Sequence, residues 1–222
     1  MVQNKPQAEK DPEVAIASAI GRVEAFIMRN SRSLLTALGV VIIVVGGFFG
    51  YKYLVAVPRM EKASAMMFAA EQQFAQDSFK LALNGDGNFA GFLQVIEKYG
   101  STGTGNVARH YAGICYLRLG QYQEALDYLT QYKGSTDDVP SALLAAQNYG
   151  LRGDVYVQMG DYAEAAKSYE KAVATSSDPL TAPYYLKKAG EVYEKLGDNA
   201  KALAAYEAVE VDYPTSMEAR DI

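Results

Sequence analysis

The chain has 222 residues, of which 50% are hydrophobic and 21% are charged, so it can build a hydrophobic core. Charge is divided unevenly, because residues 58–222 hold 15 of the 21 Lys/Arg and 22 of the 26 Asp/Glu, a net charge of −7. An acidic domain repels a phosphate backbone, so no nucleic acid is expected as a partner.

The N-terminal part divides in two by composition. Residues 1–12 are polar and include two prolines, which is typical of a disordered tail. Residues 13–33 predict an amphipathic juxtamembrane helix, because branched apolar side chains recur at intervals of four, three and four residues: Ile16, Ile20, Val23 and Ile27. Such a helix could lie on a membrane surface, pack on a partner helix, or simply lead into the next segment.

Residues 34–57 predict one transmembrane helix. The first 18 of them carry no charge, and a bilayer core needs about 20 residues of helix. An uncleaved anchor is favoured over a buried core helix or a signal peptide, because 33 residues precede the run and Pro58 follows it. We expect Pro58 to mark the stop of the helix. Three basic residues flank each side, so charge alone leaves the orientation open.

Residues 106–222 contain an internal repeat. The pattern Gly-x-x-Tyr-x-x-x-Gly-x-x-x-x-Ala occurs three times, at spacings of 40 and 37 residues. Its positions are Gly113, Tyr116, Gly120 and Ala125; Gly153, Tyr156, Gly160 and Ala165; and Gly190, Tyr193, Gly197 and Ala202. The first Gly and the Ala are expected where two helices cross closely, and the second Gly where the first helix ends in a left-handed turn.

This pattern resembles the tetratricopeptide repeat family. The resemblance implies an all-α chain, in which a single N-terminal transmembrane helix precedes a tetratricopeptide-repeat α-solenoid. We expect three repeats, at about 106–139, 146–179 and 183–216, with a truncated or short cap after them. The spacings exceed the family's usual length of about 34 residues, which predicts lengthened second helices or connections.

Residues 58–105 predict a degenerate repeat. A helix is expected over 59–77, and Asp77-Ser78-Phe79 stands where Gly-Gln-Tyr stands in the first full repeat. The second helix is expected to break at Asn84–Asn88 and to resume over 89–99. That break resembles the start of a calcium loop, but it lacks the glycine and the glutamate that such a loop requires.

The family's geometry implies a concave face lined by the first helix of each repeat. The partner-binding residues expected on it are Val107, His110, Ile114, Leu117, Gln147, Asp154, Val157, Tyr184, Lys187 and Glu191. This face suits an extended or partly unfolded protein segment, although it could instead pack a capping helix or a partner's helix.

Catalytic chemistry is not expected. His110 is the single histidine and Cys115 the single cysteine, so neither a multi-histidine metal site nor an intrachain disulfide can form. The glycine-rich stretch 100–105 has no P-loop lysine and is interpreted as a link. Neither an enzyme activity nor a cofactor nor a metal is predicted.

The order of segments over 34–222 also resembles the YfgM-type ancillary subunits of the bacterial Sec translocon, with the 84–88 loop and the 111–116 stretch similar to Bacteroidetes versions. That resemblance implies a single-pass protein of the bacterial inner membrane, with its N-terminus cytoplasmic and its repeats periplasmic. Its implied partners are the SecYEG translocon, a membrane-anchored prolyl isomerase and unfolded client chains. The alternatives are a structural assembly scaffold of an envelope secretion or division complex, and a cytoplasm-facing repeat adaptor.

Overall fold

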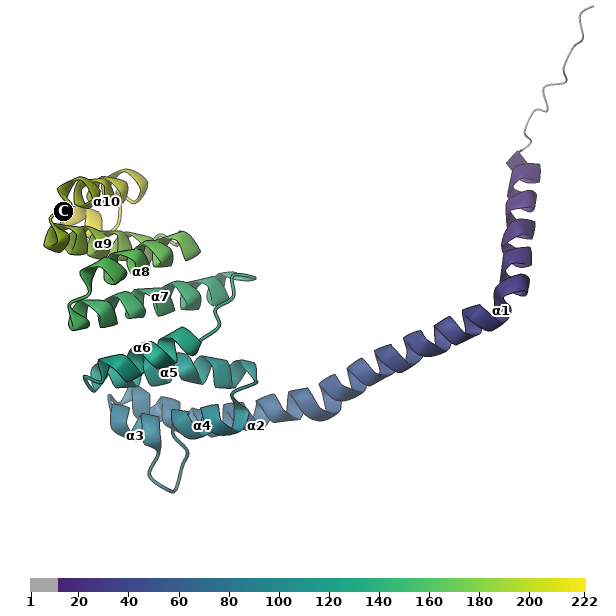
Figure 1. Ribbon diagram of the computed structural model, residues 1–222, viewed down its shortest axis with the longest axis horizontal. Helices are drawn as coiled ribbons and strands as arrows, with labels where there is room; N and C mark the ends of the chain where they lie inside the picture. Colours follow the sequence, from purple (N-terminus) through teal and green to yellow (C-terminus); the bar gives the residue numbers. More distant parts are fainter. Residues whose placement is uncertain (1–11) are drawn as a thin grey trace, which may run out of the picture. The chain divides into compact units, whose positions relative to one another are not determined.

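The computed structural model describes residues 12–222, so the predicted tail lies almost wholly outside the described residues. Every regular element in the described part is helical, apart from one isolated β-bridge between Gly85 and Ala90. The predicted all-α class is therefore confirmed. The chain divides into two units, Met1–Val57 and Pro58–Ile222, each described by itself below (Figure 1).

The first unit contains α1 (Pro12–Tyr51) and a π-helical turn, η1 (Lys52–Ala56). Asn30 leaves helical geometry (φ −111°, ψ 15°) and kinks α1, and its side-chain amide donates to the Phe26 carbonyl at 2.9 Å. The kink lies three residues before the predicted end of the juxtamembrane helix at residue 33. The kink separates the part of α1 that carries Ile16, Ile20, Val23 and Ile27 from the predicted transmembrane stretch that begins at residue 34.

One helical segment of the described residues, Ala19–Ala75, is long and apolar enough to cross a membrane by length and composition. The apolar side chains before α2 in this segment are exposed, with Ile43 at 74% and Leu54 at 79%. Both a membrane anchor and a signal sequence satisfy this test. The prediction that Pro58 stops the helix is wrong, because helical structure continues into α2 (Val57–Ala75). A wider π turn precedes Pro58, which lacks the N–H of a regular helical ladder.

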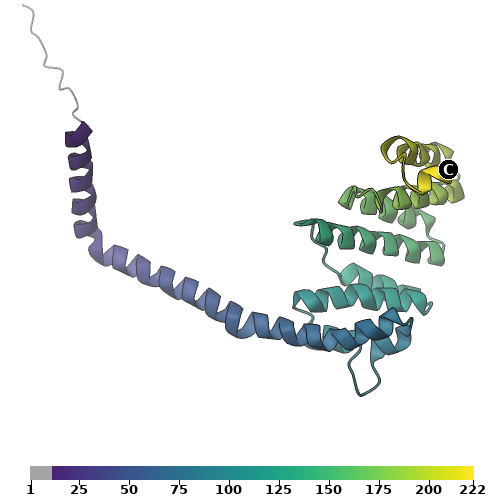
Figure 2. The same ribbon diagram turned by 180° about the vertical axis from the view of Figure 1, so that it is seen from behind.

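Three helix pairs form most of the second unit and follow one another in chain order along the stack (Figures 1 and 2). The first helix of each pair carries the first Gly and the Tyr of the repeated pattern, and the second helix carries its Ala. The pairs are α5 (Gly103–Arg118) with α6 (Tyr122–Gln131), α7 (Val139–Met159) with α8 (Tyr162–Thr175), and α9 (Ala182–Leu196) with α10 (Asn199–Asp212).

The extra length of the repeats lies partly in the connections between pairs, 132–138 and 176–181, which was one of the two predicted alternatives, and partly in a first helix. Helix α7 has 21 residues against 16 in α5 and 15 in α9, so a long first helix contributes to the 40-residue spacing together with the connection before it. The second helix before it, α6, has only 10 residues, so the expectation of a lengthened second helix is wrong there. Asp138 starts α7 early, because its carboxylate accepts the Ser141 N–H at 2.8 Å.

The turn between the two helices has the same geometry in every repeat. Gly120, Gly160 and Gly197 adopt φ of 75°, 78° and 75°, the left-handed region that glycine enters without steric cost. The N–H of the next residue then donates to the carbonyl five residues earlier, at 2.9 Å in each case.

The degenerate repeat keeps this turn without a glycine. Asp77 adopts φ 56°, and the Ser78 N–H donates to the Gln73 carbonyl at 2.9 Å, as in the three full repeats. After it come α3 (Phe79–Asn84), a loop, and α4 (Phe92–Tyr99). In the loop the Asp86 carboxylate accepts the N–H groups of Asn88 and Phe89 at 2.9 and 3.2 Å, so it stabilises its own turn.

The degenerate repeat and the first full repeat share one hydrophobic core. Phe92 of α4 is fully buried and stacks on Tyr111 of α5, with ring centroids 5.3 Å apart, while Phe74 of α2 meets both rings edge-on. At the other end of the stack a short 3-10 turn, η2 (Glu218–Arg220), follows α10. Asp221 after it pairs with Lys187 of α9.

Candidate interaction groove

Each helix pair packs closely because the first helix has a glycine at the crossing point. A Cβ atom at Gly113 would lie 2.5 Å from Leu129 Cγ, and one at Gly153 would lie 2.5 Å from Tyr169 Cε1. At Gly190 the corresponding distance, to Tyr206 Cε1, is 2.4 Å. Contacts this short leave no room for a methyl group, so glycine allows a bulky side chain of the second helix to reach the first.

The alanines and tyrosines of the pattern pack beside these crossings. Ala125 and Ala165 are fully buried and Ala202 is 3% exposed. Tyr116 stacks on Tyr128, with ring centroids 5.2 Å apart. The Tyr156 ring is half-buried against the core. The buried ring of Tyr193 keeps its hydroxyl bonded to Glu170, and burial together with that bond raises the Tyr193 pKa to about 12.

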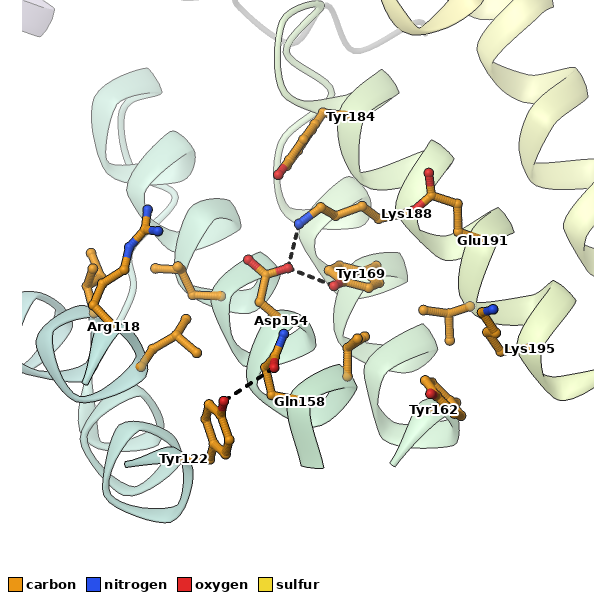
Figure 3. Close-up of a pocket in the computed structure, with 15 residues that line it drawn as sticks. Arg118, Tyr122, Asp154, Gln158, Tyr162, Tyr169, Tyr184, Lys188, Glu191 and Lys195 are labelled. Carbon is orange, nitrogen blue, oxygen red and sulfur yellow. Dashed lines mark hydrogen bonds and ion pairs between the residues drawn. The ribbon is translucent and has the colours of Figure 1, made fainter. Parts of the chain in front are cut away.

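The second unit contains a groove of about 700 Å³ that draws residues from all three full repeats (Figure 3). Volumes of this size are typical of sites that take a ligand or a few side chains of a partner. The groove is lined by Ile114, Leu117, Arg118, Tyr122, Leu151, Asp154, Val157, Gln158, Tyr162, Tyr169, Tyr184, Lys188, Glu191, Val192 and Lys195.

The apolar surface of the groove is the outer edge of the core. Leu117 and Leu151 pack partly buried against the core cluster of Ala125 and Leu129, and Val157 packs against the next cluster along the stack. The remainder of each side chain faces the groove, so a ligand can cover apolar surface without any rearrangement of the core.

Asp154 forms the polar centre of the groove (Figure 3). Its carboxylate accepts the Tyr169 hydroxyl at 2.7 Å and pairs with the Lys188 ammonium at 2.6 Å. Lys188 also lies 4.7 Å from the Tyr184 ring centroid and 5.6 Å from that of Tyr169. Burial lowers the pKa of Lys188, but its bonds to Asp154 and Tyr184 outweigh that effect and leave the pKa raised. Lys188 is therefore charged at neutral pH.

Six of the ten predicted partner-binding residues line the groove: Ile114, Leu117, Asp154, Val157, Tyr184 and Glu191. Lys187 lies instead in a neighbouring hollow of about 510 Å³, which is also lined near the C-terminus by Met217, Glu218, Arg220 and Asp221. Val107 and Gln147 line neither space.

The placement of His110 on the binding face is corrected by the structure. His110 is 1% exposed, and its Nδ1 lies 3.2 Å from the Asn148 side-chain amide of α7. Burial lowers the His110 pKa to about 4, although a side-chain hydrogen bond with Gln147 acts in the opposite direction. This histidine is therefore a neutral core residue between two repeats, because its position on α5 turns toward α7 and away from solvent.

The sequence-based set omitted nine groove residues, and most of them follow the register of the repeats. Leu151 and Lys188 lie two residues before the first Gly of their pattern, while Arg118, Gln158 and Lys195 lie five residues after it. Tyr122 and Tyr162 each begin a second helix. Repeat register could have found these residues; Tyr169 and Val192 required the fold.

Two kinds of reactive site, a metal centre and a nucleophilic cysteine, can be checked in the described part of the chain. No cluster of three or more His, Cys, Asp or Glu that could hold a metal occurs among residues 12–222. Cys115 is fully buried, and burial raises the pKa of its thiol to about 12, so the thiolate nucleophile is not populated at neutral pH.

Two tetratricopeptide repeat models match residues 106–178 and 151–217, which together make up about half of the chain. The chain is therefore a tetratricopeptide repeat protein. Such repeats form scaffolds that typically carry no catalysis, and they imply protein partners. No curated protein matches the sequence.

Among solved structures, the chain is similar to two described as the crystal structure of MamA protein and the crystal structure of MamA. The first has a TM-score of 0.54 at 18% identity, over 69% of this chain and 74% of that chain. The second has a TM-score of 0.52 at 18% identity, over 65% and 74%. At this identity the similarity shows a shared repeat fold only.

Proposed function

We propose that this protein is a membrane-anchored adaptor whose repeat groove binds a segment of another protein. The observation that carries the proposal is the groove itself, in which three repeats contribute exposed apolar edges around the Asp154–Lys188 pair. A surface with both apolar and ionic groups can take up a polypeptide and also fix its orientation.

The exposed apolar helix supports the anchor. The large apolar side chains of residues 34–55 are exposed, and exposed apolar surface of this extent is stable only in a lipid or protein environment. In this proposal, residues 34–57 cross the membrane and hold the repeats at its surface.

The more specific proposal places the repeats in the periplasm, beside the SecYEG translocon of a bacterial inner membrane. There the groove would hold unfolded client chains near a membrane-anchored prolyl isomerase. The support for this placement is the order of segments: one apolar helix, a degenerate repeat and then regular repeats.

Site-specific photo-crosslinking in cells tests the groove and the partner together. Photoreactive residues at Ile114 and Val157, both in the groove, are expected to capture translocon subunits or emerging chains. A matched probe at Leu203, which is 58% exposed on α10 outside the groove, is expected to capture neither. Equal capture at all three positions would contradict a binding groove, and a single stoichiometric partner without emerging chains would favour an assembly scaffold instead.

Protease treatment of intact spheroplasts tests the orientation. We expect cleavage within residues 58–222 without lysis, because the repeats are proposed to lie outside the cytoplasm. Protection before lysis, with cleavage only afterwards, would place the repeats in the cytoplasm and refute the translocon-side location.

A further inference from the structure

The edge of the groove carries two cations at equivalent positions of the first and third repeats. Arg118 and Lys195 each lie five residues after the first Gly of their pattern, and Gln158 holds this position in the second repeat. All three side chains are exposed, and Figure 3 shows Arg118 and Lys195 at opposite sides of the groove with Asp154 and Gln158 between them.

These two cations have no partner within the described part of the chain. Neither Arg118 nor Lys195 belongs to any of the four ion pairs formed among residues 12–222. The charge of Lys188, in the same groove, is balanced by its ion pair with Asp154. Glu191 is the remaining charged residue in the groove, and it likewise forms no ion pair. The uncompensated charge of the groove is thus positive by one, within a unit whose net charge is −7.

We infer that the groove binds an extended polypeptide segment with two carboxylates about six residues apart and branched apolar side chains between them. Two helix-packing steps of roughly 10 Å each separate α5 from α9, and an extended chain advances about 3.3 Å per residue. One carboxylate then meets Arg118 and the other meets Lys195. The apolar side chains between them cover Leu117, Leu151 and Val157. This inference rests on the proposed binding function and specifies its ligand.

Three fluorescent peptides that differ only at two positions six residues apart provide the test. These positions hold Asp, Asn or Lys, with the same Leu- and Val-containing segment between them, and binding to the full chain in detergent micelles is measured by fluorescence anisotropy. We expect the Asp peptide to bind about tenfold more tightly than the Asn peptide, the Lys peptide to bind most weakly, and the difference to shrink at high salt.

Variants of the chain assign the preference to particular residues. R118Q and K195Q, which copy the natural Gln158, are each expected to weaken the Asp peptide two- to fivefold and to leave the Asn peptide unchanged. E191Q is expected to tighten the Asp peptide, a change that a purely structural role would not produce. K167Q is the matched control, because Lys167 is an exposed cation on α8 outside the groove.

The outcomes separate the ligand class from the binding function. Equal affinity for all three peptides that is lost in V157D would uphold the groove and overturn the acidic ligand. Binding of none of them, or binding that V157D does not affect, would contradict the proposed function itself. Arg118 and Lys195 also lie in the last turn of their helices, where a cation stabilises the helix end. If the Gln variants only lower thermal stability and leave the Asp preference intact, the inference is overturned.

Discussion

The hydroxyl of Tyr169 donates a 2.7 Å hydrogen bond to Oδ1 of Asp154, so the second helix of the middle repeat is bonded to its first helix inside the groove. The same oxygen pairs with Lys188 of the next repeat. We expect D154A to lower the free energy of unfolding by about 2 kcal/mol, because it leaves a half-buried ammonium and a buried hydroxyl without their acceptor.

Tyrosine fluorescence during urea unfolding measures this change, because Trp is absent and all but two of the 17 tyrosines lie in residues 58–222. Y169F removes one hydrogen bond and is expected to cost about 1 kcal/mol. The double variant D154A/K188M is expected to lose less unfolding free energy than D154A and K188M lose in sum, because it also removes the ammonium that D154A leaves unpaired. Strict additivity would show that Asp154 and Lys188 are not coupled.

Gly153 lies where the Tyr169 ring crosses α7, and G153A is expected to destabilise the repeat unit by about 1–3 kcal/mol. The added Cβ would meet Cε1 of Tyr169 at 2.5 Å, and this ring is held in place by its bond to Asp154. The control is G103A at the start of α5, where nothing lies within 4 Å and alanine favours the helix. Equal urea midpoints for the two variants would rule out the close crossing.

Asp77 holds a left-handed conformation that glycine adopts at the three equivalent turns. D77G is expected to raise the free energy of unfolding by about 0.5–1 kcal/mol, because it removes the steric cost of a Cβ at positive φ. The reverse change at an equivalent turn, G160D, is expected to lower it by a similar amount. Thermal melting of both variants checks this pair, and a stabilised G160D would contradict the shared turn geometry.

His110 makes the stability of the repeats depend on pH. Its pKa is about 4 in the folded chain against 6.5 in an unfolded one, so below pH 6.5 the unfolded state binds the extra proton. Stability from this group is therefore complete above pH 6.5 and is lost as pH falls toward 4, by on the order of 2–3 kcal/mol.

Urea unfolding at pH 7.5 and pH 4.5, compared between the native chain and H110Q, isolates this contribution. Glutamine cannot gain the proton, so H110Q is expected to lose less stability between the two pH values, while the titration of carboxylates affects both chains alike. The same pH dependence in both proteins would show that His110 is not buried as a neutral group.

The parts of the fold that depend on local repetition were the ones open to prediction. Glycine at positions 120, 160 and 197 ends a helix by its own conformational freedom, so the sequence was sufficient to predict these turns. The early start of α7 depends on a helix cap at Asp138, and the sequence around this residue is equally compatible with a connection between helices. His110 was wrongly predicted to lie on the binding face, because the position of a residue within one repeat does not show how far the helix of the next repeat covers that residue.

The contact between His110 and Asn148 joins α5 of one repeat to α7 of the next. In a linear array, stability is approximately a sum of terms for each repeat and for each interface between neighbours, and this contact belongs to an interface. Protonation of His110 thus weakens the coupling between repeats more than the repeats themselves. Acid would reduce the cooperativity of unfolding, so that the part before α7 and the part from α7 onward melt as separate segments, each with its own hydrogen-exchange rate.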